Sequence, residues 1–181
     1  VCMSGRTAHG EMTLERAFTR SCNVTFGKLA YQLGADRLRA TAETFGFNEN
    51  FKFGDFVVYN SSFPQSMRNM NGLVWAGIGQ GEVLVTPLHM AMISGAVANG
   101  GQMMQPYLVE EVKTSAGQVR RRGASKVYRR VMSEETAQTI AKYMYETVRS
   151  GTASSAAISG YNVCGKTGSA ETSDDKTKET N

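Results

Sequence analysis

The amino-acid sequence predicts a mixed α/β (α+β) fold, with a helical lobe over about residues 10–100 and part of a helix-backed antiparallel sheet over about residues 101–181. Three observations support this fold class. Apolar residues recur every three or four positions in much of the first half, as in amphipathic helices. After Pro106 the pattern becomes extended and rich in turn residues. A last helical pattern begins at Ser133.

The first helical pattern covers residues 13–33 and contains a polar break. Thr13 suits the N-cap, and Gly34 suits the C-terminal stop. The centre of the pattern is rich in poor helix formers, so two helices joined by a break at residues 21–23 fit as well as one long helix. A further short helix is predicted over residues 36–45.

The middle of the chain alternates between turn-forming segments and one helix. Residues 47–72 lack sustained periodicity, which predicts a long connection, and the glycines of residues 77–81 predict a tight backbone loop. Thr86 and Pro87 then fit the N-cap and first position of a helix that residues 99–101 end.

The second half is predicted to be mostly extended around one helix. Strands are expected at residues 107–113, 118–122 and 127–131, the first two forming a hairpin. Ser133 is a candidate N-cap for a helix that ends near Gly151. The small residues of segment 161–170 predict a strand that a ligand can approach closely, and the polar residues 172–181 predict a loop.

Composition excludes several classes of protein. The 181 residues are 41% hydrophobic and 20% charged, which excludes a disordered or fibrous chain. The formal net charge of +4 is too small to indicate nucleic-acid binding by itself. No stretch approaches the roughly 20 apolar residues of a membrane span, and Val1 opens no signal peptide, so we expect a soluble globular piece.

The cysteines and histidines do not indicate a metal site or a disulfide framework. Cys2, Cys22 and Cys164 are too few and too scattered for such a framework, although Cys2 and Cys22 can pair outside the cytosol. His9 and His89 lie eighty positions apart, which argues against a zinc site. Cys22 and Cys164 are expected to pack in the interior.

Two short motifs contain residues suited to acyl-transfer chemistry. They are Ser21-Cys22-Asn23 at the predicted helix break and Lys166-Thr167-Gly168-Ser169 on the predicted strand. Alone, the first is explained as a helix-breaking cap, and Lys166 as an exposed lysine of an edge strand. Their order, together with the intervening Gly79-Gln80-Gly81 and Thr86-Pro87-Leu88, makes a chance match much less credible.

With these residues the chain resembles the transpeptidase domain of penicillin-binding proteins, especially the class B enzymes of elongation or sporulation. The resemblance covers essentially the whole chain and includes Gly151-Thr152-Ala153. It implies the penicillin-binding, serine β-lactamase-like fold and a peptidoglycan DD-transpeptidase that cross-links stem peptides through a serine acyl-enzyme. It further implies acylation by β-lactam antibiotics and no need for a cofactor or metal. The resemblance also implies a location at the extracytoplasmic face of the cell membrane and membrane-anchored cell-wall synthesis partners. It implies no nucleic-acid partner.

The resemblance also implies roles for individual residues. The catalytic set is Ser21, Asn23 and Lys166: Ser21 relays a proton to the leaving amine, and the Asn23 amide donates to a substrate carbonyl. Lys166 supplies a cation that tunes nearby proton transfers and favours a substrate carboxylate.

The substrate-binding set is Thr167, Gly168 and Ser169. Two hydroxyl groups can donate to the carboxylate if both face the cleft, and Gly168 lets the backbone approach the substrate. The Ser169 N–H is the expected oxyanion donor.

The nucleophile of the family is missing where the pattern requires it. Ser-x-x-Lys should precede Ser21, yet the only match in the chain is Ser173-Asp174-Asp175-Lys176 in the polar tail, where neighbouring acids disfavour an alkoxide. We expect that match to be fortuitous. The chain is therefore expected to be an internal fragment without the nucleophile and the C-terminal strands, and inactive alone.

Other functions remain open. The same motifs occur in a D-Ala-D-Ala carboxypeptidase or a β-lactam sensor. A non-enzymatic module that binds cell-wall polymer through the cleft or the basic hairpin is a second alternative. That hairpin contains six cations in eleven residues: Arg120, Arg121, Arg122, Lys126, Arg129 and Arg130. They fit a solvated hairpin, or contact with anionic cell-wall polymer, a membrane surface or nucleic acid, but no aromatic interleaving accompanies them.

Overall fold

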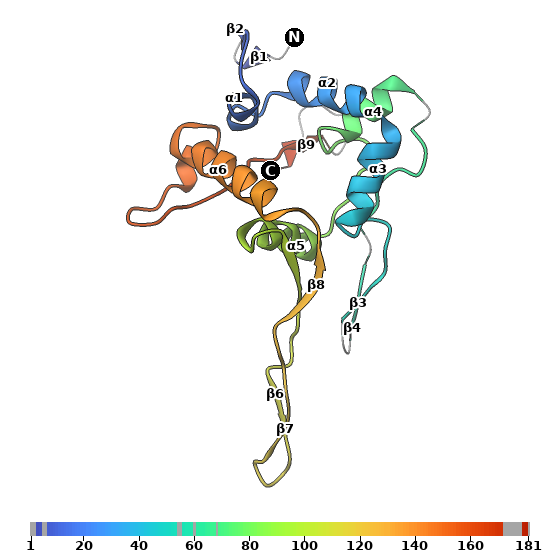
Figure 1. Cartoon of the computed structure of the whole chain (residues 1–181), viewed down its shortest axis with the longest axis vertical. Coiled ribbons are helices and arrows are strands. Elements are labelled where there is room, and N and C mark those ends of the chain that lie inside the picture. Colours follow the sequence, from blue (N-terminus) through green and yellow to red (C-terminus); the bar gives the residue numbers. More distant parts are fainter. Residues whose placement is uncertain are drawn as a thin grey trace. The chain divides into compact units, whose positions relative to one another are not determined.

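A computed structural model describes residues 3–4, 7–53, 56–59, 61–67, 69–171 and 179–180 (Figure 1). The chain divides into two units that are interleaved in sequence. The first holds residues 1–42, 63–83 and 139–181, and the second holds residues 43–62 and 84–138.

The first unit contains a helix break at residues 21–22, one of the two alternatives that the sequence allowed. Helix α1 (Leu14–Thr19) ends at Arg20, and α2 (Asn23–Leu33) begins three residues later. The Thr13 side chain caps α1 by accepting a hydrogen bond from a backbone N–H of the first turn. Of the two alternatives that the sequence left open, the structure shows two helices.

Helix α4 (Met70–Ala76) packs against α2 at very short range. A Cβ atom added at Gly27 would lie 2.7 Å from Cγ1 of Val74, and one added at Gly77 would overlap the Cβ of Ala30. The two glycines therefore allow the helix backbones to approach.

The remaining elements of the first unit are short, apart from α3 and α6, whose residues are divided between the two units. They are β1 (Met3–Ser4), β2 (Thr7–Ala8), α3 (Ala35–Thr44), the C-terminal part of α6 (Glu134–Ser150), the 3-10 helix η1 (Ser154–Ala156), β9 (Ala170–Glu171) and β10 (Glu179–Thr180). Strands β1 and β2 pair antiparallel, as do β9 and β10. Ser133 caps α6 as predicted, because its hydroxyl oxygen accepts from the backbone N–H of Thr136 at 3.1 Å.

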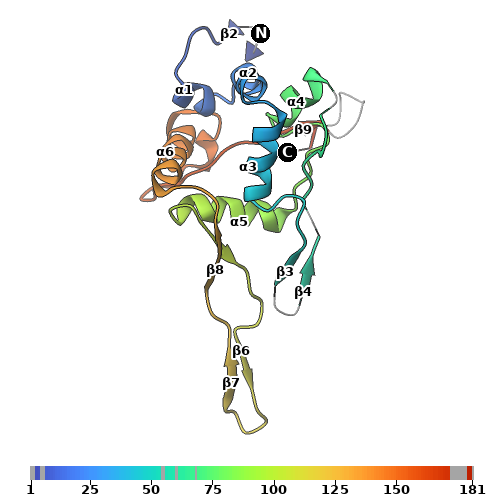
Figure 2. The same ribbon diagram turned by 45° about the vertical axis from the view of Figure 1, so that its right-hand side comes forward.

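The second unit contains helix α5 and antiparallel strand pairs, besides the ends of α3 and α6. Its elements are β3 (Phe51–Phe53), β4 (Phe56–Val58), α5 (Pro87–Ala98), β5 (Gln102–Gln105), β6 (Glu111–Lys113), β7 (Val119–Arg122) and β8 (Lys126–Arg130). The pairs are β3–β4, β5–β8 and β6–β7. Figures 1 and 2 show the β6–β7 hairpin continuing from the β5–β8 pair as a long ribbon. The predicted hairpin and the strand near residues 127–131 are confirmed.

A hydrophobic core lies where α5 packs on β5. Its buried members are Phe51, Phe53, Met92, Ala96, Met103 and Val131. The Phe51 and Phe53 rings stack with their centroids 5.3 Å apart. This core fixes the base of the ribbon.

A buried histidine lies beside this core. His89 is fully buried between the rings of Phe47 and Phe51, with Nε2 2.8 Å from the carbonyl oxygen of Phe45. Because burial disfavours the charged imidazolium, the pKa of His89 lies below its ordinary value.

Four segments differ from the sequence-based prediction. The predicted connection over residues 47–72 contains the β3–β4 hairpin and the start of α4, whose N-terminus is capped by the Asn69 side chain. Strand β5 was not predicted, because its pairing with β8 is non-local. Residues 162–169 do not form a strand, since in the described part of the chain no neighbouring strand pairs with them. Residues 172–178 and 181 of the predicted tail lie outside the described residues, while β10 shows that the tail is not loop throughout.

The helices of the described segments include none that is long and apolar enough to cross a membrane.

Candidate active site

A cavity of about 520 Å³ in the first unit brings together all six site residues that the sequence predicts. Three segments line it: the end of α1 with the following break and the start of α2, the loop after α4, and residues 166–169. The lining residues are Phe18, Ser21, Asn23, Phe26, Gly77, Ile78, Gly79, Gln80, Lys166, Thr167, Gly168 and Ser169. The two motifs, far apart in sequence, thus meet at one site.

The helix break presents Ser21 in an unusual backbone conformation. Its φ angle of +53° lies in the left-handed region that non-glycine residues rarely adopt. The turn is held by the backbone N–H groups of Ser21 and Cys22, which donate to the carbonyl oxygens of Phe18 at 3.0 Å and Ala17 at 2.9 Å. The chain therefore turns sharply at Ser21 before α2 begins.

Lys166 makes the contact that joins the two motifs. Its Nζ donates hydrogen bonds to Oγ of Ser21 at 2.8 Å and to the carbonyl oxygen of Thr167 at 2.8 Å. The ammonium group also lies 5.8 Å from the ring centroid of Phe18, within cation–π range. The serine hydroxyl and the lysine amine are therefore in direct contact.

The electrostatic environment of Lys166 favours loss of its proton. No carboxylate among the described residues forms an ion pair with it, and desolvation lowers the pKa of Lys166 below the usual lysine value. A lysine with a lowered pKa exchanges a proton near neutral pH more readily than an ordinary surface lysine.

Residues 167–169 form an open, exposed wall of the cavity. Oγ1 of Thr167 lies 2.7 Å from Oγ1 of Thr152, so one hydroxyl donates to the other. A Cβ atom added at Gly168 would meet nothing within 4 Å, which leaves space for a ligand beside the backbone. Asn23 is the first residue of α2 and contributes its exposed side chain to the same cavity.

Two polar contributors to the site were not predicted. The side-chain amide of Gln80 donates to the carbonyl oxygen of Ser169 at 2.6 Å, and Thr152 contacts Thr167. The glycine-flanked Gln80 and the segment 151–153 were part of the family resemblance, but neither was assigned a role. Spacing alone does not show which distant backbone carbonyl a glutamine side chain reaches.

The cysteines differ in burial. Cys22 is buried and accepts a hydrogen bond at Sγ from the Thr25 hydroxyl at 3.3 Å, as expected for an interior residue. Cys164 is exposed, so its predicted interior position is wrong. It lies in the segment that approaches the cavity wall without joining a strand. Cys2, and with it the alternative of a Cys2–Cys22 disulfide, lies outside the described residues, as does the serine of the Ser173–Lys176 match.

Within the part of the chain that the structure describes, no three histidine, cysteine or acidic side chains lie close enough together to hold a metal ion. The polar side chains that line the cavity offer hydroxyl, amide and amine groups. Such groups donate hydrogen bonds to carboxylates, and hydroxyl and amine groups can exchange protons.

The family model described as "Penicillin binding protein transpeptidase domain" matches residues 4–181. Peptidoglycan D,D-transpeptidase PbpA of Mycolicibacterium smegmatis is 32% identical over 160 residues, covering 88% of this chain and 32% of that protein. Stage V sporulation protein D of Bacillus subtilis is 30% identical over 170 residues, covering 92% of this chain and 26% of that protein. The chain thus spans a third or less of these curated relatives.

Solved structures show the same fold. The D,D-transpeptidase domain of a peptidoglycan glycosyltransferase from Eggerthella lenta aligns with a TM-score of 0.81 and 34% identity, covering 93% of this chain and 44% of that one. The ceftriaxone acyl-enzyme complex of penicillin-binding protein A from M. tuberculosis aligns with a TM-score of 0.86 and 30% identity, covering 97% and 42%. The predicted fold class is confirmed.

Proposed function

Since the chain belongs to the penicillin-binding protein transpeptidase family, we propose that it is part of a peptidoglycan D,D-transpeptidase. Such an enzyme cross-links stem peptides through a serine acyl-enzyme and is acylated by β-lactams. The observation that carries the proposal is the 2.8 Å hydrogen bond from Nζ of Lys166 to Oγ of Ser21 inside a cavity lined by both motifs.

The chemistry needs a proton at the leaving amine. When a nucleophilic serine forms its bond to the substrate carbonyl, its hydroxyl proton passes to the lysine of its Ser-x-x-Lys motif, the C–N bond breaks and the departing amine takes up a proton. Ser21 donates that proton from its hydroxyl, and Lys166 replaces it through the hydrogen bond between them. The lowered pKa of Lys166 supports this transfer, because it brings the amine closer to the operating pH.

The other cavity residues are proposed to bind the substrate. The hydroxyl groups of Thr167 and Ser169 donate to the terminal carboxylate, with Lys166 supplying positive charge. The backbone N–H of Ser169 stabilises the oxyanion, and the Asn23 amide donates to a substrate carbonyl. The open space beside Gly168 supports the close approach that this binding mode requires.

The nucleophile itself is proposed to lie outside residues 1–181. The one Ser-x-x-Lys match in the sequence, at residues 173–176, follows the Lys-Thr-Gly motif rather than preceding Ser21, and the curated relatives are three or more times as long as the matched region. The 181-residue chain alone is therefore inactive in this proposal. The whole protein acts at the extracytoplasmic face of the cell membrane, with membrane-anchored cell-wall synthesis partners.

Intact-mass measurement after incubation with benzylpenicillin tests the proposal. We expect a covalent adduct on a longer chain that includes the upstream segment, and none on residues 1–181. In the longer chain, Ser21→Ala and Lys166→Ala should each slow acylation by roughly 10²–10⁴-fold. Lys28→Ala, which removes an exposed lysine of α2 outside the cavity, should leave the rate unchanged.

Two results contradict parts of the proposal separately. No adduct on the longer chain would refute the acyl-transfer function. An adduct on residues 1–181 would leave the function standing and place the nucleophile within this chain.

A further inference from the structure

The second unit carries a concentration of positive charge that the proposed reaction does not use. Between Gln105 and Arg130 the chain has seven cationic and two acidic side chains, a net charge of +5, against +4 for all 181 residues. The rest of the chain is therefore close to neutral. This segment comprises the β6–β7 ribbon and its connections to β5 and β8.

Only part of this charge is neutralised by neighbouring acids. Glu111 pairs with Lys113 at 2.5 Å and with Arg122 at 3.6 Å, and Glu49 pairs with Arg129. Arg120 and Lys126 form no ion pair with any residue that the structure describes. Two cations on the ribbon are thus available to an anionic partner.

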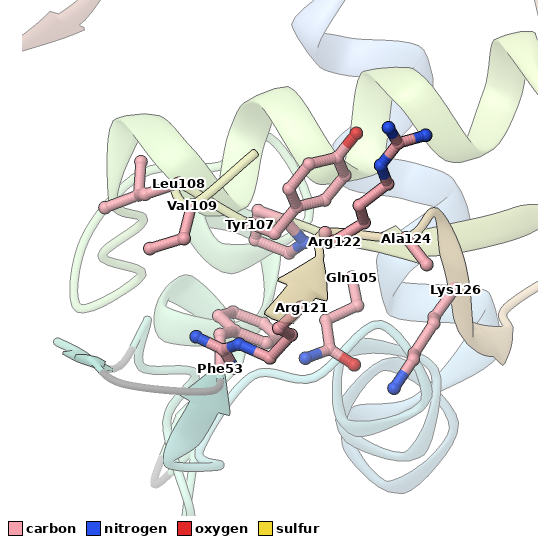
Figure 3. Close-up of a pocket in the computed structure, with 11 residues that line it drawn as sticks. Phe53, Gln105, Tyr107, Leu108, Val109, Arg121, Arg122, Ala124 and Lys126 are labelled. Carbon is pink, nitrogen blue, oxygen red and sulfur yellow. The ribbon is translucent and has the colours of Figure 1, made fainter. Parts of the chain in front are cut away.

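An apolar pocket lies at the base of the same ribbon (Figure 3). Its volume is about 420 Å³, and the buried ring of Phe53 contributes to its lining. Tyr107, Leu108 and Val109 line it while remaining 52%, 79% and 39% exposed. Contiguous exposed apolar side chains around a pocket of this size are typical of a binding site. Lys126 lines the pocket too, so a cation and apolar surface occur together.

The ribbon also offers backbone hydrogen-bonding groups. Strands β6 and β7 pair only with each other among the described strands, so each has one edge without a partner strand. All four residues of β7 are exposed. An extended peptide can add to such an edge by β-augmentation.

We propose that the ribbon and its basal pocket form a docking site for an acidic segment of a partner protein with a large apolar side chain. The apolar side chain fills the pocket, and acidic residues beside it pair with Arg120 and Lys126. A peptide explains the pocket and the free strand edges together with the charge, whereas an anionic lipid surface explains the charge alone. This surface is independent of the proposed acyl transfer, since none of its residues lines the Ser21–Lys166 cavity.

Fluorescence anisotropy with labelled synthetic peptides tests the proposal on the 181-residue chain. The first peptide has a central leucine flanked by aspartate and glutamate, the second replaces the leucine with serine, and the third replaces the acids with their amides. We expect the first to bind and each of the others to bind about tenfold more weakly, because charge and apolar burial both contribute.

Protein variants locate the interaction. Arg120→Glu combined with Lys126→Glu should weaken the acidic peptide at least about tenfold, and a peptide with lysines in place of the acids should bind this variant instead. Leu108→Ser should weaken the leucine peptide without changing the weak binding of the serine peptide. The matched control is Lys28→Glu combined with Arg37→Glu, which makes the same charge change on exposed positions of α2 and α3 and should leave affinity within about twofold.

Three outcomes overturn the proposal. They are no binding of any peptide, equal weakening by the control pair, and binding of phosphatidylglycerol vesicles through Arg120 and Lys126 with no peptide bound. The last outcome assigns the ribbon to an anionic membrane surface.

Discussion

Exchanging glycine and alanine at Gly77 and Ala30 tests the close packing between α2 and α4 that positions the cavity loop. Gly77 has an ordinary helical φ of −65°, which alanine adopts without backbone strain. The cost of Gly77→Ala therefore comes only from the steric clash of its side chain. The new Cβ would overlap the Cβ of Ala30, a rigid atom that cannot rotate away. Overpacking of this kind costs about 1–3 kcal/mol.

The reverse change makes the space that the new methyl needs. Ala30 is 2% exposed, so Ala30→Gly removes a buried methyl worth about 0.8 kcal/mol and adds a helical glycine that costs about 0.5–1 kcal/mol. The double variant restores the buried methyl from the opposite helix. The free energy of unfolding of the double variant should therefore fall by only about 1 kcal/mol, against about 3–4 kcal/mol if the two changes were additive.

Urea unfolding followed by far-UV circular dichroism measures the four free energies of this cycle. Gly95→Ala serves as the control, because a Cβ there would meet nothing within 4 Å; in a helix it should stabilise by about 0.5–1 kcal/mol. Two results would refute the inferred close packing. The first is that the two single changes in unfolding free energy add up to that of the double variant within about 0.5 kcal/mol, and the second is a Gly77→Ala variant as stable as Gly95→Ala.

Three further predictions follow from other contacts. Phe51→Ala should lower the free energy of unfolding by about 3–5 kcal/mol in the same urea assay, because this ring is fully buried in the core; a loss under 1 kcal/mol would contradict that packing. Because the pKa of His89 is lowered in the folded chain, the unfolded chain binds more protons below about pH 6.5, and stability should fall as pH decreases through that value. His89→Gln should flatten this dependence, and an unchanged pH curve would show that another group causes it. Gln80→Glu removes the amide donor to the Ser169 carbonyl and should speed amide hydrogen exchange in residues 166–169 about fivefold, measured by mass spectrometry; unchanged exchange would show that this hydrogen bond does not hold the segment.

Local signals predicted the helices well. Thr13, Thr86 and Ser133 cap helices as their side-chain chemistry predicts, because capping depends on residues within one turn. The strands were less predictable. Strand β5 depends on a partner more than twenty residues away, and the Lys-Thr-Gly segment lacks a strand partner within the described chain, so its composition alone did not indicate its state.

The sequence predicted which residues form the candidate site, but not the contacts between them. The two motifs are separated by 143 residues, counted from Asn23 to Lys166, so only the family resemblance placed them together. The hydrogen bond between Ser21 and Lys166 and the lowered pKa of Lys166 depend on the folded surroundings of the amine. Gln80 was visible in the sequence as part of a glycine-rich loop, but its hydrogen-bond partner lies 89 residues away.

The left-handed backbone at Ser21 sets thermostability against the contact between Ser21 and Lys166. Glycine adopts this conformation without the strain of roughly 1–3 kcal/mol that a side chain adds, so Ser21→Gly relieves strain at that residue. The same change deletes the hydroxyl group that Lys166 contacts. A directed-evolution experiment that selects for melting temperature alone would therefore favour glycine at position 21 and yield a more thermostable protein without this contact. Libraries built for stability should keep position 21 fixed.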